Sequence, residues 1–91
     1  MKKWIGGDID LWVIFEGLSQ SGSFKDFGMT VLVSIAKLVA QLLIAASTGD
    51  TSASAAAYAA AADLPCVVVL PIGFVTEAQI AQCKIHGVTI I

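Results

Sequence analysis

The sequence predicts a small α/β domain built on a mainly parallel sheet. Short apolar runs rich in strand-forming residues alternate with segments of helical character along the chain. The runs are apolar at almost every position, as strands buried on both faces of a parallel sheet are. We therefore expect residues 1–91 to form a single three-layer βαβαβαβ unit, with helices on both faces of a four-stranded sheet.

The first half of the chain provides two strands and one helix. Leu11–Phe15 is a continuous apolar run and predicts a buried strand, followed by a Gly/Ser loop at Gly17–Ser23. A helix can begin at Lys25 or Asp26 and run to Val39 or Gln41. Leu42–Ala46 predicts the second strand.

The next helix is unusual because it is almost all alanine. Ser47–Asp50 predicts a turn, and Asp50, Thr51 or Ser52 can cap the helix Ala53–Ala62 at its N-terminus. Small side chains allow a helix to lie close to its sheet. Asp63–Pro65 then ends the helix.

The last third of the chain carries the clearest local signals. Cys66–Leu70 predicts a strand, and Thr76 with Gln79 has the form of a capping box. The helix that follows extends to His86, where Gly87 suits the position just beyond its end. Val88–Ile91 predicts the fourth strand.

The composition argues for a folded chain with exposed apolar surface. Of the 91 residues, 57% are hydrophobic and 13% are charged, against about 45–50% and about 25% in ordinary soluble domains. This balance excludes intrinsic disorder. With so few charges to cover a small domain, we expect self-association or a missing complementary domain.

The charge pattern does not favour nucleic acid. The net charge is −2, the five basic residues are all lysines, and no basic patch is apparent. Cys66 and Cys83 lack the spacing of a zinc site, and His86 is the single histidine, so we expect no metal. Buried reduced thiols favour a cytoplasmic location.

A membrane location is not favoured either. Gly6, Gly7 and the acidic residues after them interrupt any signal peptide. The stretch Met29–Thr48 is apolar enough to raise the possibility of a small membrane protein. However, Lys37 would lie near the bilayer centre, and Ser34, Lys37 and Gln41 share one helical face, as in a half-buried soluble helix.

Ligand chemistry is expected at the carboxyl edge of the sheet, where three loops meet. These loops are Leu18–Lys25, Ser47–Ser52 and Pro71–Thr76. Gly, Ser and Thr before a helix N-terminus suit a phosphate or carboxylate, although plain turn and capping chemistry explains them too.

Lys25 is the unusual residue at this edge. A lysine in the first turn of a helix is disfavoured by the dipole, and the same field favours the neutral amine that Schiff-base chemistry requires. A solvated lysine that merely follows Phe24 is the plain alternative.

Two motifs resemble the threonine synthase family. Ser21–Thr30, SGSFKDFGMT, is similar to that family's cofactor-lysine motif, and Ser47–Tyr58, STGDTSASAAAY, is similar to its second signature. The resemblance covers about residues 10–91. It implies a pyridoxal phosphate enzyme of the tryptophan-synthase-β fold type, which converts O-phosphohomoserine and water into threonine and phosphate.

The resemblance also implies roles for individual residues. Lys25 would be the Schiff-base lysine and would shuttle protons. Phe24, Lys25 and Asp50 would contact the cofactor, whereas the substrate would be bound by Ser47, Thr48, Gly49 and Thr51. Asp50 is an awkward neighbour for a carboxylate and can instead cap the helix.

The chain departs from the family in ways that lower the activity we expect of it. The family enzymes are several times longer, and their phosphate-binding loop and pyridine-nitrogen partner have no counterpart in this sequence. Basic residues typical of the family are replaced by Ile14, Phe27 and Phe74. We expect a truncated or engineered piece with weak or no activity alone, or else a non-catalytic module that self-associates through these apolar residues.

Overall fold

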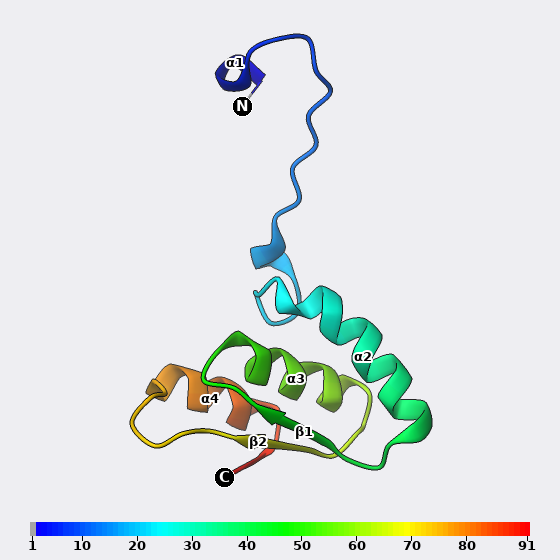
Figure 1. Ribbon diagram of the computed structural model, residues 1–91, viewed down its shortest axis with the longest axis vertical. Coiled ribbons are helices and arrows are strands. Elements are labelled where there is room, and N and C mark those ends of the chain that lie inside the picture. Colours follow the sequence, from blue (N-terminus) through cyan, green and yellow to red (C-terminus); the bar gives the residue numbers. More distant parts are fainter. Residues whose placement is uncertain (1) are drawn as a thin grey trace.

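The computed structural model describes residues 2–91, which form a parallel α/β layer with an extended N-terminal arm (Figure 1). The body of the chain contains three strands and three long helices. In chain order the elements are α1 (Lys2–Ile5), a 3₁₀ turn η1 (Glu16–Leu18), α2 (Lys25–Val39), β1 (Leu43–Ala46), α3 (Asp50–Ala61), β2 (Cys66–Val69), α4 (Glu77–Ile85) and β3 (Thr89–Ile90).

The sheet has three strands in the order β1-β2-β3, and both pairs are parallel. Leu43 lies beside Cys66 and Ala46 beside Val69, and β3 continues the ladder with Thr89 beside Val67. The parallel α/β class predicted from the sequence is confirmed. The helix and strand boundaries from Lys25 onward agree with the prediction to within a few residues.

The prediction of a strand at Leu11–Phe15, the first of the four expected, is wrong. These residues belong to an extended arm that leads away from the sheet (Figure 1). Trp12 is 85% exposed, and Ile14 and Phe15 are also mostly exposed. A strand needs a neighbour to complete its hydrogen-bond ladder, and the arm pairs with no strand in the part of the chain that the structure describes.

The prediction of three layers is also wrong. Helices α3 and α4 lie on the same face of the sheet, and α2 packs against α3 (Figure 1). Along β1, Leu43 and Ala45 face the helices and are half-buried, whereas Ile44 on the other face is 65% exposed. The sheet therefore has one covered face and one open apolar face.

The core is narrow because α3 approaches the sheet closely. Ala56 and Ala59 contact the β2 residues Cys66 and Val68, and Cys83 of α4 completes the cluster. A second cluster joins α2 to α3 and consists of Met29, Val33 and Ala55. Larger residues on this face of α3 would separate the helix from the strands.

Both cysteines lie in the first cluster, as buried reduced thiols. They are free, and burial raises the pKa of the Cys83 thiol. Burial also raises the pKa of the Cys66 thiol, and the neighbouring Cys83 adds to the effect. The thiols are therefore neutral core residues at physiological pH.

The ends of α4 agree with the caps predicted from the sequence, whereas the start of α3 does not. The capping box is present as predicted: Thr76 Oγ1 accepts from the Gln79 amide, and the Gln79 side chain accepts from the Thr76 amide. Gly87 follows α4 with a φ of 70°, the left-handed conformation expected of it. By contrast, α3 begins earlier than predicted, with Gly49 as the N-cap and no side-chain cap from Asp50, Thr51 or Ser52.

The membrane prediction concerned Met29–Thr48. Helix α2 has 15 residues and ends at Val39, after which the chain turns into β1. Across residues 2–91, every helix falls short of the length and apolar character needed to cross a bilayer.

Candidate functional site at the carboxyl edge of the sheet

The N-terminal ends of the three long helices are linked at the carboxyl edge of the sheet. The loop Ser47–Gly49 follows β1 and leads into α3, and residues 70–76 follow β2 and lead into α4. Helix α4 reaches both neighbouring loops. Gln82 Nε2 donates a 3.3 Å hydrogen bond to the carbonyl of Ser21, and Gln79 Nε2 lies 3.9 Å from where a Cβ on Gly49 would stand.

Lys25 is the first residue of α2, and its side chain is exposed. Its backbone N–H donates to Ser23 Oγ at 3.2 Å, which holds the start of the helix. Its Nζ lies 4.9 Å from the centroid of the Phe24 ring, a cation–π contact on the preceding residue. The amine is therefore accessible to a reagent or ligand from solvent.

Asp26, the next residue, is the most strongly held side chain at this edge. It is 2% exposed, yet its carboxylate accepts three hydrogen bonds. The Ser21 amide donates to Oδ2 at 2.8 Å, and the hydroxyls of Ser21 and Ser54 each donate to Oδ1 at 2.5 Å. Burial alone would raise the pKa of Asp26, but the bonds from Ser21 and Ser54 outweigh it and lower the pKa to about 2.

The sequence motifs indicate Asp26 only as a possible start of a helix and assign no role to Ser54. The signal that could have found the pair is the presence of serines inside an alanine-rich helix. A buried serine in a helix interior needs a hydrogen-bond partner, and a nearby acid is one of the strongest available.

The loop between β1 and α3 has its own internal bonds. The Gly49 amide donates to Ser47 Oγ at 3.2 Å, and Ser52 Oγ donates to the Ser47 carbonyl at 2.9 Å. Thr48 and Asp50 are exposed, whereas Ser47, Gly49 and Thr51 are half-buried. Because no side chain caps α3, its first N–H groups face the loop without that partner.

The structure therefore brings the two predicted segments together. Ser54, one turn into α3, bonds to Asp26 in the first turn of α2, across 28 residues of sequence. Along the chain, Phe24 and Lys25 directly precede Asp26. The other predicted site residues precede Ser54, and they are Ser47, Thr48, Gly49, Asp50 and Thr51. The Asp26 carboxylate is a charged connection between them.

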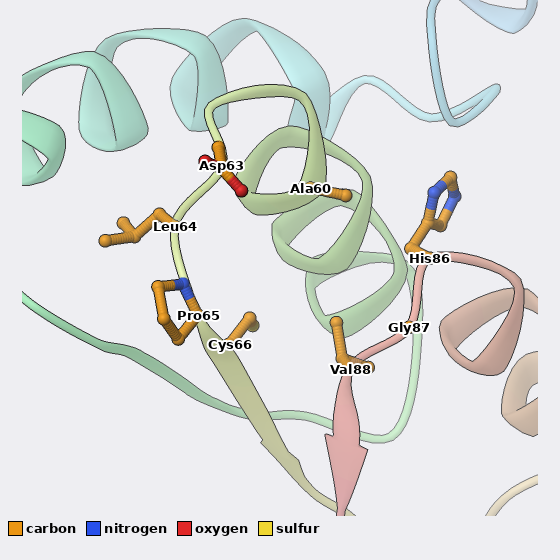
Figure 2. A pocket seen from close by; sticks show the side chains of 8 residues that line it. All are labelled: Ala60, Asp63, Leu64, Pro65, Cys66, His86, Gly87 and Val88. Carbon is orange, nitrogen blue, oxygen red and sulfur yellow. The ribbon is translucent and has the colours of Figure 1, made fainter.

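A depression of about 520 Å³ lies at the opposite end of the sheet. Figure 2 shows its lining, which comes from the end of α3, the start of β2 and the turn between α4 and β3. The C-terminal ends of two helices carry partial negative charge, and the Asp63 carboxylate adds to it. This hollow is therefore poorly suited to an anionic ligand, and the carboxyl edge is the better candidate site.

The described part of the chain contains no cluster of side chains that could bind a metal ion. Among residues 2–91, no three His, Cys, Asp or Glu side chains gather closely enough to hold an ion.

The structure thus places an exposed lysine at the start of α2 and an uncapped N-terminus of α3 at one edge of a parallel α/β sheet. Residues 2–91 match the family described as pyridoxal-phosphate dependent enzymes, and the chain belongs to this family. The pyridoxal phosphate family that the two motifs implied is thereby confirmed.

Threonine synthases are among the most similar relatives. The enzyme of Synechocystis sp. is 47% identical over 92 residues, which include 100% of this chain and 24% of that protein. The threonine synthase of Mycobacterium tuberculosis H37Rv is 48% identical, with 100% and 25% covered. The chain thus spans about a quarter of the length of these relatives.

Solved structures support the fold. A pyridoxal 5′-phosphate-dependent aspartate racemase aligns with a TM-score of 0.73 at 22% identity, with 84% of this chain and 24% of that chain covered. Maize serine racemase also aligns with a TM-score of 0.73, at 23% identity and with 85% and 24% covered.

Proposed function

We propose that the chain is the lysine-bearing segment of a threonine-synthase-like enzyme. The observation that carries the proposal is the placement of Lys25, an exposed amine at the start of α2, next to Asp26, which is bonded to α3. The family match and the identity to threonine synthases support the choice of cofactor and reaction.

The residues present fit part of the cofactor and substrate. Pyridoxal phosphate carries an aldehyde, which suits the accessible Lys25 amine. A substrate carboxylate suits the uncapped N-terminus of α3, where Ser47, Thr48, Gly49 and Thr51 would bind it. The cofactor phosphate has no comparable cradle among these loops, so we expect weak binding and no threonine synthase activity from the 91 residues alone.

Each residue has a distinct role in this proposal. When bound, the cofactor would supply an electron sink. Lys25 Nζ would hold the cofactor and carry a proton to and from the substrate, and Phe24 would contact the cofactor beside it. Asp50, in the first turn of α3, would face the cofactor ring, while the N–H groups of this turn orient the substrate carboxylate.

The test is to add pyridoxal phosphate to the chain, reduce with borohydride, and map the modified peptides. We expect the label on Lys25, with the other four lysines labelled only at the level of free amines. Inorganic phosphate should suppress labelling at Lys25, because an anion at the uncapped N-terminus of α3 would occupy the position proposed for the substrate carboxylate. Equal labelling of all the lysines, with no effect of phosphate, would contradict the proposal.

Activity can be tested by grafting. The matching quarter of the Synechocystis threonine synthase is replaced with this chain, and phosphate release from O-phosphohomoserine is measured. The Lys25→Ala graft should be inactive, whereas the Lys37→Ala graft should retain the activity of the parent graft. A Lys25→Ala graft as active as its parent would refute the catalytic role.

Self-association is the second candidate, because apolar side chains stand where the family typically has basic ones. Ile14, Phe27 and Phe74 are all more than half exposed. They belong to the arm, to α2 and to the loop before α4. Changing Phe27 and Phe74 to lysine should yield a smaller species in sedimentation, and an unchanged mass would exclude these contacts.

A further inference from the structure

Asp26 is the buried charge at the carboxyl edge, and none of the roles proposed above uses it. Its side chain is not available to a ligand, since it is 2% exposed and its oxygens are engaged by Ser21 and Ser54. It follows Lys25 directly in the chain. A side chain in this position can influence Lys25 only through the backbone and the loop that it holds.

The hydrogen bonds of Asp26 connect it both to the loop before α2 and to α3. Two bonds from Ser21 fold the loop of residues 21–25 back onto the first turn of α2. The third bond comes from Ser54, which is fully buried in α3. The carboxylate therefore connects the loop that carries Lys25 to the helix that begins at the Ser47–Gly49 loop.

Apolar packing alone does not fix the position of the first turn of α2 relative to α3. The apolar contact between α2 and α3 lies further along α2, at Met29 and Val33. Near Ser54, α3 carries only alanine and serine side chains, which offer little shape to fix the position of the first turn of α2. A charged hydrogen bond at the first turn is directional, so it sets where the N-terminus of α2 stops.

We propose that Asp26 is a positioning residue, which uses its bonds to Ser21 and Ser54 to hold the Lys25 amine in register with the N-terminus of α3. This inference rests on the proposed function, because register matters only if Lys25 and the loop before α3 act on one ligand. Placement of this kind has large effects on reactivity, since small displacements of reacting groups can cost orders of magnitude in rate.

The test compares Ser54→Ala with Val33→Ala in the full 91-residue chain. Ser54→Ala removes one bond to Asp26, whereas Val33→Ala removes packing between the same two helices, away from Lys25. Each variant is incubated with limiting pyridoxal phosphate and reduced with borohydride. The label on Lys25 relative to Lys84, an exposed lysine on α4, and its rate of formation are measured, with circular dichroism as the check on folding.

We expect Ser54→Ala to lower the preference for Lys25 about tenfold, while Val33→Ala keeps it despite a lower melting temperature. Asp26→Asn should behave as Ser54→Ala does. Within the loop, Ser21→Thr keeps the hydroxyl and should retain the preference, whereas Ser21→Ala should lose it.

The outcomes separate the two proposals. If the unchanged chain prefers Lys25 and the folded Ser54→Ala variant prefers it equally, the positioning role is refuted and the proposed function stands. If Val33→Ala loses the preference to the same degree, Asp26 contributes only to stability and the positioning role is again refuted. If the unchanged chain shows no preference, the proposed function itself is wrong.

Discussion

The ionisation of Asp26 predicts how the stability of the chain depends on pH. Its pKa falls from an ordinary 3.8 to about 2 in the folded chain, because bonds from Ser21 and Ser54 favour the carboxylate over the opposing effect of burial. A lowered pKa stabilises the fold above the unfolded value, and this contribution disappears as the pH falls through the folded value. The stabilising effect is therefore complete above about pH 5 and lost by about pH 1–2.

The size of the effect follows from the pKa difference. A fall from 3.8 to about 2 corresponds to about 2 kcal/mol, at about 1.4 kcal/mol per pKa unit. Asp26→Asn should remove about this much of the free energy of unfolding at pH 6. The amide also turns an N–H donor toward groups that themselves donate, which adds to the loss.

Urea unfolding followed by circular dichroism measures this difference. The gap between the unchanged chain and Asp26→Asn should be constant between pH 6 and about pH 5 and should narrow from there toward pH 2. Asp8→Asn, at an exposed position in the arm, is the matched control and should follow the unchanged chain at every pH. A gap that stays constant from pH 6 to pH 2 would refute the reasoning.

Three further predictions concern the packing and the ends of the helices. Ala59→Leu should destabilise the fold by about 1–3 kcal/mol in urea unfolding because it separates α3 from β2, whereas Ala61→Leu at an exposed position should have little effect. Thr76→Ala removes half of the capping box and should cost about 1 kcal/mol, seen as a lower melting temperature. Gly87→Ala places a side chain at a φ of 70° in open space and should cost about 1 kcal/mol from backbone strain alone. An unchanged melting temperature for Thr76→Ala would contradict the capping box, and one for Gly87→Ala would contradict the left-handed conformation after α4.

Prediction from sequence succeeded where the signals lie within a few residues of one another. The start of α2 at Lys25, the strand Cys66–Val69 and the capping box at Thr76 were all anticipated. Caps, helical periodicity and apolar runs act through neighbours along the chain, so a linear sequence contains them in full.

It failed at Leu11–Phe15, where the apolar run has the composition of a strand. Strand formation depends on a partner elsewhere in the structure, and the described chain supplies none for this segment. The same limitation explains the open face of the sheet. Ile44 and Val69 have the character of buried residues, but no helix covers that face of the described chain.

The sequence by itself determined the alternation of strands and helices, the family motif around Lys25 and the close packing that an alanine-rich helix allows. Only the tertiary structure decided that the helices share one face and that Asp26 bonds to Ser54, 28 residues away. The physical reason is range: propensities and caps act along the chain, whereas a buried carboxylate selects its partners from whatever the folded chain brings within hydrogen-bond distance.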